Sequence, residues 1–456
     1  MSAAEPTSTP ADVAQRAVEL VRQAAGDGAE VEAIADTRAF ALTRFANSFI
    51  HQNVADATTT LRIRLHLDGR TATGTTTRLT PDGLAALAER TVAASRLLPL
   101  DPGWPGLAPP ASPSGAGNVD DATAAVIPAD RAEVVRHFVD ACDGLEAAGY
   151  CQTTHGVAAY ANSSGHSLTA AATTAAFDGM ARTGVSDGVA RRASVRLADL
   201  DGAALGAHAA AKARAAHHAV EVEPGEYEVV LEPNATRDML MNLALFGLNG
   251  KAVAERRSFV RLGEQQLDPA VTIVDDATAP DALGLPFDVE GTPKRPVTLI
   301  DRGVSAAVAH DRRTAAEVDA ETTGHAIPGG ERWGAFPSNM RLVPGEGGGQ
   351  SVDELVGAVD RGLLVSDIWY TRVLDPRTLV ITGLTRNGLF LIEGGEVVGA
   401  VENMRFTQSY PRALAPGAVL GVADDATAIP DEWEGGATVV PSVRLASWNF
   451  TGGASG

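Results

Sequence analysis

The chain has 456 residues, of which 45% are hydrophobic and 21% charged, so it can fill more than one hydrophobic core. Two domains, or three, are expected for this length. Acidic residues outnumber basic residues by 57 to 37, which gives a formal net charge of -20. Because phosphate binding needs a basic surface, this balance argues against nucleic acid and against an anionic membrane surface as partners.

The cysteines and the N-terminal residues indicate the cellular compartment in which the protein is expected. Cys142 and Cys151 give neither a disulfide framework nor zinc-finger spacing. Residues 1–15 lack the basic start and the apolar run of a signal peptide. No stretch approaches the roughly 18 apolar residues of a membrane-spanning helix. We therefore expect a cytoplasmic protein with reduced thiols.

The first half of the chain predicts helices combined with antiparallel strands. Alternating apolar residues indicate strands over residues 30–35 and 61–67, and Asp68-Gly69 indicates a hairpin turn after the second. Residues 150–200 read as a meander of antiparallel strands. The loop over residues 99–130 is long enough to be functional or a tether. Apolar residues at helical spacing predict helices over residues 10–26, 82–98, 129–148 and 202–218.

The second half reads as a separate, strand-rich domain. Pro and Gly among charges in "EVEPGEY" (221–227) mark the boundary, so the predicted domains are residues 1–222 and 223–456. Ser351 and Glu354 form a capping box that predicts a helix start. The expected class is α+β. Strands are expected over residues 226–231, 271–274, 297–300, 379–382, 389–392 and 397–401.

Sequence patterns for catalysis are weak. The ten histidines form no His-Glu-x-x-His pattern, and no phosphate-binding glycine loop follows a strand. The Gly-x-Ser-x-Gly match at residues 184–188 precedes a strand-like run where a nucleophile elbow needs a helix, so we read it as a turn. The carboxylates clustered between residues 274 and 296 include Asp288 and Glu290. These can serve as acid and base, but their Gly- and Pro-rich setting favours turns.

The most unusual segment is residues 321–345. It has few apolar groups to bury, so its polar side chains are candidates to hold a peptide backbone or carboxylate. A purely structural loop is equally consistent with the residues. The candidate peptide-binding residues are His325, Arg332, Asn339 and Arg341.

At this loop the sequence resembles the TldD/PmbA family of cytoplasmic metallopeptidase subunits, also described as modulators of DNA gyrase. The resemblance extends over almost the whole chain, and its most specific parts lie in the second half. These parts are "RRSFVRLGEQQLDPAVTIVDD" (256–276), "LPFDVEGTPKRPVTLIDRGV" (285–304), "TTGHA" (322–326), "SNMRLVPG" (338–345) and "ELVGAVDRGLLV" (354–365).

The resemblance implies two kinds of subunit, one of which holds zinc through a His-Glu-x-x-x-His helix and a Cys near the C-terminus. The matching helix lies within "TRDMLMNLALFGLNGKAVAERRSF" (236–259), which we expect to be one helix with a Gly-broken end. Residues 236–254 contain no His, Glu or Cys, and no Cys follows Gly421. Met241, Asn242 and Phe246 cannot replace zinc ligands. This chain therefore resembles the PmbA (TldE-like) subunit, with a vacated metal helix and no catalytic residue of its own.

The resemblance implies a non-catalytic subunit of a heteromeric zinc peptidase that degrades or processes unfolded peptides. Zinc is expected in a paralogous TldD-like partner and not in this chain. Two alternatives remain open. One is a stand-alone peptide-binding or scaffold protein of the same fold, and the other is a hydrolase that uses His325 with Asp288 and Glu290.

Overall fold

The computed structural model describes residues 9–113, 115–345, 348–430 and 436–453. It has a mixed α+β fold, which confirms the expected class. Residues 9–218, here called the N-terminal half, combine helices with one antiparallel sheet. Residues 219–453, the C-terminal half, are rich in strands.

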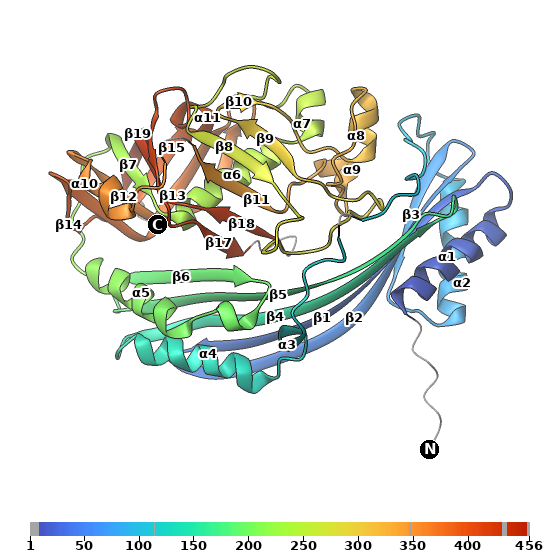
Figure 1. Cartoon of the computed structure of the whole chain (residues 1–456), viewed down its shortest axis with the longest axis horizontal. Coiled ribbons are helices and arrows are strands. Elements are labelled where there is room, and N and C mark those ends of the chain that lie inside the picture. The colour runs from blue at the N-terminus through green and yellow to red at the C-terminus, as the bar shows by residue number, and fades with distance from the viewer. Residues whose placement is uncertain (1–8, 114, 346–347, 431–435, 454–456) are drawn as a thin grey trace.

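The sheet of the N-terminal half has six antiparallel strands in the order β3-β2-β1-β4-β5-β6. Figure 1 shows this sheet curving around the C-terminal half, which lies against its concave face. The curved sheet therefore forms one wall of the interface between the halves. Its strands are β1 (Glu30–Ala46), β2 (Phe49–Leu67), β3 (Arg70–Thr76), β4 (Glu146–Asn162), β5 (Ser167–Arg182) and β6 (Asp187–Ser194).

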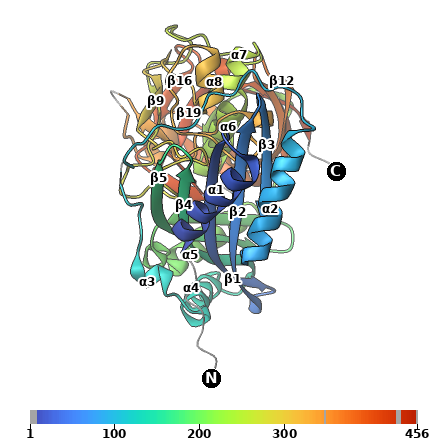
Figure 2. The same ribbon diagram turned by 90° about the vertical axis from the view of Figure 1, so that its right-hand side faces the viewer.

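Residue alternation gives this sheet one apolar and one polar face, since successive side chains of a strand point to opposite sides. Val31, Leu61 and Ile63 pack against the helices of the convex face. Glu32 and Arg64, from the intervening positions, face the C-terminal half. Figure 2 shows two of these helices alongside β1–β3. They are α1 (Pro10–Ala25) and α2 (Pro81–Ser95); the rest of this half contains α3 (Asp121–Ala124), α4 (Pro128–Ala141), the 3-10 turn η1 (Leu197–Asp199) and α5 (Gly202–Ala215).

Two further sheets build the C-terminal half. The first has the order β10-β9-β8-β11-β18-β17, and the second has the order β12-β7-β19-β15-β13-β14 with β16 paired to β19. An additional pairing of β12 with β13 closes five strands of the second sheet into a small barrel. The first sheet consists of β8 (Val271–Asp275), β9 (Val297–Asp301), β10 (Val304–Ser305), β11 (Met340–Pro344), β17 (Thr427–Pro430) and β18 (Ala437–Val440). The second consists of β7 (Gly225–Leu231), β12 (Arg361–Asp375), β13 (Val380–Glu393), β14 (Glu396–Ala400), β15 (Met404–Ser409), β16 (Val419–Val422) and β19 (Val443–Gly453).

One large apolar core joins these two sheets, and helix α6 contributes to it. Within the described ranges, no helix is both long and apolar enough to cross a membrane. The capping box at Ser351 and Glu354 is present and starts α10, as predicted. The helices of this half are α6 (Pro233–Phe246), α7 (Gly250–Ala254), α8 (Arg312–Glu317), α9 (Gly330–Trp333), α10 (Val352–Gly357) and α11 (Tyr410–Ala413).

The long loop expected over residues 99–130 ties the two halves together. Arg313 donates to both oxygens of Asp101 at 2.8 Å, and Arg312 donates to the carbonyls of Gly106 and Leu107 at 2.9 and 2.7 Å. These bonds fix the start of α8 against residues 101–107 of the loop.

The structure corrects several expected boundaries. The helix predicted over residues 129–148 ends at Ala141, because residues 146–162 form β4. The strands predicted over residues 30–35 and 61–67 are parts of the much longer β1 and β2, whose middle sections lack the alternating apolar residues used for the prediction. The segment 236–259 holds two helices separated at residues 247–249, and residues 255–259 are not helical.

Candidate functional site

Helix α6 occupies the segment where the family resemblance implies a metal helix. Pro233 suits its first turn, and Met239, Leu240 and Leu243 are buried in the large core. The helix ends before Gly247, and the Phe259 ring leaves no room for a side chain at that position: a Cβ at residue 247 would lie 2.3 Å from Phe259 Cε1. The glycine at the break that the sequence indicated is thus a packing requirement.

The three residues named as replacements for ligands all contribute to this packing. Met241 is buried, and its Sδ accepts a weak hydrogen bond from Thr438 Oγ1 at 3.6 Å. Phe246 packs against the edge of the large core. Asn242 donates from Nδ2 to the carbonyl and the Oδ2 of Asp238 at 2.9 and 3.0 Å. All three side chains therefore make their contacts with other groups of the same chain.

Sequence reasoning missed Asp238, the one carboxylate on this helix. It also accepts hydrogen bonds from Thr371 Oγ1 at 3.0 Å and from the Tyr410 hydroxyl at 3.3 Å. Burial raises the pKa of Asp238 to about 6, against the opposing effect of the Thr371 hydrogen bond. The spacing of Asp238 and Asn242, four residues apart on a helix, was the signal that could have identified the pair.

The residues of α6 and α7 do not fit a zinc ion. Zinc is held by thiolate, imidazole or carboxylate ligands, and catalytic sites use three of them. Asp238 supplies the one such group on these helices, and its oxygens already accept three side-chain hydrogen bonds. In the part of the chain that the structure describes, no cluster of three or more His, Cys, Asp or Glu side chains is placed to hold a metal.

The structure buries His325 within a hydrogen-bonded network. His325 Nε2 lies 2.8 Å from Asp275 Oδ1, and Nδ1 lies 2.9 Å from Thr323 Oγ1. Asp275 Oδ2 accepts the backbone N–H of Asn339 at 2.7 Å. Although burial acts to raise it, the pKa of Asp275 is lowered overall by the His325 ring and by these hydrogen bonds. The network fixes the 321–345 segment to the end of β8.

Asn339 is also buried and holds a second segment of chain. Its side chain accepts the N–H of Leu283 at 2.9 Å and donates to the Leu283 carbonyl at 3.0 Å. The structure thus brings His325 and Asn339 together through Asp275. The side-chain polar atoms of both residues form hydrogen bonds with other groups of the protein.

The two predicted arginines lie in different settings. Arg332 is exposed, with its guanidinium 4.9 Å from the centre of the Trp333 ring. Arg341 forms a bidentate ion pair with Asp281, with N···O distances of 2.6 and 3.1 Å. Peptide binding by the four predicted residues stays a prediction.

The hydrolase alternative needed His325 within hydrogen-bonding distance of Asp288 or Glu290. Both His325 ring nitrogens are instead used by Thr323 and Asp275, and no hydrogen bond joins His325 to either carboxylate among the described residues. Asp288 accepts backbone N–H groups, including that of Ala326 at 2.9 Å. Glu290 accepts from Arg64 and from the Arg312 backbone. Asp288 bonds the backbone of its own turn, as the turn interpretation expected, whereas Glu290 binds groups distant in sequence.

Comparisons with known proteins agree on one family. A family model for the PmbA/TldA metallopeptidase C-terminal domain matches residues 224–452, just over half of the chain. A metalloprotease of Methanocaldococcus jannaschii is 26% identical over 214 residues, or 46% of this chain and 44% of that protein. A metalloprotease of Methanothermobacter thermautotrophicus is 26% identical over 142 residues, or 30% and 31%. The chain thus spans less than half the length of the curated relatives it matches.

Solved structures extend the similarity to the fold of nearly the whole chain. TldE from Thermococcus kodakarensis superposes with a TM-score of 0.85 at 19% identity, covering 96% of this chain and 99% of that one. A protein from Thermotoga maritima described as a modulator of a DNA gyrase gives a TM-score of 0.80 at 19% identity with the same coverage. At these identities the structures establish the fold, and the match of the family model establishes membership: the chain belongs to the TldD/PmbA metallopeptidase family.

Proposed function

We propose that this chain is the non-catalytic subunit of a TldD/TldE-type heteromeric zinc metallopeptidase that degrades or processes unfolded peptides. The observation that carries the proposal is helix α6. It stands in the segment where the family resemblance implies a zinc helix, yet it presents Met241, Asn242 and Phe246 to the surrounding core and lacks His, Glu and Cys. The zinc and the chemistry would belong to a paralogous TldD-like partner.

In this proposal the chain helps to enclose a chamber and to hold an extended peptide. Strand addition would suit that task, since backbone hydrogen bonds tolerate many peptide sequences. It needs a sheet edge, and β3, at the end of the N-terminal sheet, pairs with β2 alone among the described strands. The proposal also includes a boundary between two domains at residues 222 and 223 and a cytoplasmic location for the protein.

The four candidate peptide-binding residues divide into two groups. The burial of His325 and Asn339 supports a role in holding the 321–345 loop in shape. Exposed Arg332, stacked on Trp333, is the group that a peptide could reach directly. Arg341 is engaged by Asp281, which a peptide carboxylate would have to displace.

The proposal is tested by assembly. This chain is expressed with and without its zinc-bearing paralogue, and the purified material is examined by size-exclusion chromatography with light scattering. The expected result is a stable complex that contains both chains. Its zinc content should match the amount of paralogue present, with no zinc bound by this chain. If the two chains elute separately at micromolar concentrations, or if this chain binds zinc when it is alone, the proposal is wrong.

A further inference from the structure

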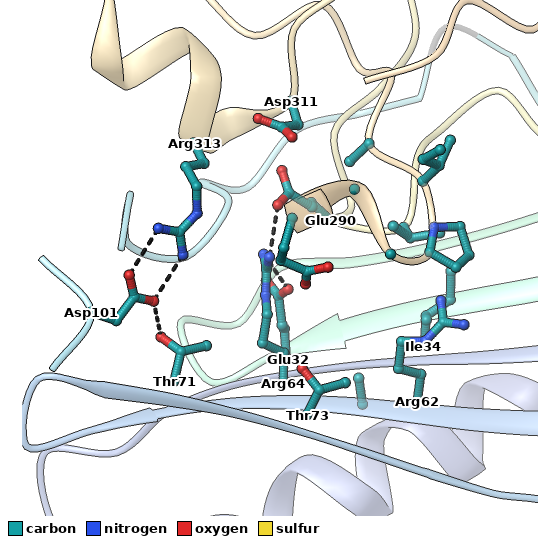
Figure 3. A pocket seen from close by; sticks show the side chains of 18 of the residues that line it. Glu32, Ile34, Arg62, Arg64, Thr71, Thr73, Asp101, Glu290, Asp311 and Arg313 are labelled. Carbon is teal, nitrogen blue, oxygen red and sulfur yellow. Dashed lines mark hydrogen bonds and ion pairs between the residues drawn. The ribbon is translucent and has the colours of Figure 1, made fainter. Parts of the chain in front are cut away.

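A cavity of about 520 Å³ lies between the concave face of the N-terminal sheet and the C-terminal half (Figure 3). Its floor comes from β1, β2 and β3, and its roof comes from the start of α8 and the loop at residues 326–331. This volume is within the range of small-molecule sites. Helices α6 and α7, the segment where the family resemblance implies a metal helix, do not line this cavity.

The arginines at the centre of the cavity are paired with carboxylates of this chain. Arg64 contacts Glu32 Oε1 at 2.6 Å and Glu290 Oε1 at 2.8 Å. Arg313 is held by both oxygens of Asp101 at 2.8 Å. Both arginines are therefore already in ion pairs with carboxylates of the protein.

Asp311 is different, because only one of its oxygens is used. The residue is 6% exposed. Its Oδ1 caps α8, accepting from the Thr314 backbone N–H at 2.7 Å and from the Thr314 hydroxyl at 2.8 Å. Its Oδ2 accepts no hydrogen bond from any residue that the structure describes. Figure 3 shows Asp311 at the edge of the cavity, above Glu290 and beside Arg313.

Gly330, which has no side chain, lines the cavity near this oxygen. A Cβ placed on Gly330 would lie 3.7 Å from Asp311 Oδ2 and 3.9 Å from Ile327, which are ordinary contact distances. A side chain at residue 330 would therefore stand beside the unused oxygen without a clash at its first atom.

The electrostatics of the cavity favour a cation at Asp311. Burial and the nearby Glu290 raise the pKa of Asp311 overall, against the opposing effects of the Thr314 hydrogen bonds and of Arg64, whose charge is shared with Glu32 and Glu290. The lining carries five carboxylates and three guanidinium groups. The third guanidinium, Arg62, lies two residues along β2 from Arg64, opposite Ile34, so it is displaced from the Asp311 end.

We propose that this cavity binds a primary alkylammonium group, which donates a hydrogen bond to Asp311 Oδ2. An ammonium group suits the site because it is a compact cation with three donors, whereas a metal ion would need several free ligand oxygens. The group can come from the N-terminus of a peptide or from a polyamine. The inference concerns this chain alone and does not depend on the partner subunit proposed above.

Calorimetric titration of the purified chain with three probes tests the proposal. The probes are trialanine, N-acetyl-trialanine and spermidine. Binding of trialanine with loss of binding on acetylation identifies a peptide N-terminus as the source, and binding of spermidine alone identifies a polyamine. If none of the probes binds at millimolar concentration, or if the acetylated peptide binds as well as trialanine, the proposal is overturned.

Two variants locate the site. Asp311→Asn keeps an oxygen to cap α8 but removes the charge, and it should weaken binding about tenfold or more, as expected for loss of a charge-assisted hydrogen bond. Gly330→Val retains Asp311 but fills the space before it and should also abolish binding. Glu317→Gln removes an exposed charge from the same helix and serves as the matched control. Equal affinity in Asp311→Asn and the unchanged chain would contradict the assignment, as would equal loss in Glu317→Gln.

Discussion

Helix α6 and the interface between the two halves use buried side chains in opposite ways. Around α6 the buried side chains are mainly apolar, and Asp238 is the one carboxylate on the helix. At the interface, Glu32, Arg64 and Glu290 form a chain of ion pairs with little exposure to solvent. The segment where family resemblance implies catalysis is thus built as ordinary core, whereas the concentrated charge lies where the halves meet.

The two regions are therefore stabilised by different interactions. Apolar packing around α6 depends on shape and area, so no single charge there holds the fold together. The interface depends on matched charges, and removing one member leaves a buried charge without its partner. Substitutions in the two regions should therefore differ in size and in their response to pH.

The largest effect is expected for Arg64→Met. This change leaves Glu32 and Glu290 buried and facing each other, which should lower the free energy of unfolding by about 3–5 kcal/mol. Denaturant unfolding followed by circular dichroism measures it. Arg16→Met, which removes an exposed ion pair with Glu19, is the control and should cost less than about 1 kcal/mol. Equal stability of the two variants would show that the interface charges do not hold the halves together.

The next largest effect is expected for His325→Ala, at about 3 kcal/mol, since it leaves the buried Asp275 Oδ1 without its partner. Thermal unfolding should be measured on the variant chain and peptide processing on its complex with the zinc-bearing paralogue, with exposed His51→Ala as the control in both. Unchanged stability together with slower peptide processing would instead favour direct peptide contact by His325.

A smaller, pH-dependent effect is expected for Asp238→Asn. Because the folded pKa of Asp238 is about 6, above its usual value of 3.8, the protonated carboxyl stabilises the fold. That contribution is fully present below about pH 4 and is lost as the pH rises through 6. The unchanged chain should therefore lose about 2 kcal/mol of stability between pH 4 and pH 7 that the variant does not lose. Parallel stability-against-pH curves for the two proteins would contradict this pKa.

The smallest effect is expected for restoring the family's zinc motif. Met241→His, Asn242→Glu and Phe246→His combined should produce no peptidase activity, because the C-terminal Cys and the supporting hydrogen bonds are missing. Zinc analysis and casein cleavage measure the result. Tight zinc binding with cleavage would mean that α6 is a nearly intact metal site.

The sequence predicted the elements whose patterns are local. The alternation in Leu61 to Leu67 and the capping box at Ser351 both appear in the structure as predicted. The long middle sections of β1 and β2 could not be predicted in the same way, because Ala, Thr and Asp residues there do not alternate in hydrophobicity. Those sections are strands because they pair with each other and with β4.

The candidate site was harder to predict because it depends on contacts between distant residues. The absence of zinc ligands in α6 could be read directly from the sequence. The pairing of His325 with Asp275, 50 residues apart, could not. Likewise, no sequence pattern pointed to Asp311, and its unused oxygen becomes visible once the cavity is assembled from both halves.

The most direct measurement is peptidase activity on one unfolded peptide, together with zinc content, for this chain alone, the paralogue alone and the two combined. The proposed function predicts that this chain alone is inert and free of zinc, and that full activity needs both chains with zinc in the paralogue. Zinc-dependent cleavage by this chain alone would contradict it and would place the metal ligands outside α6.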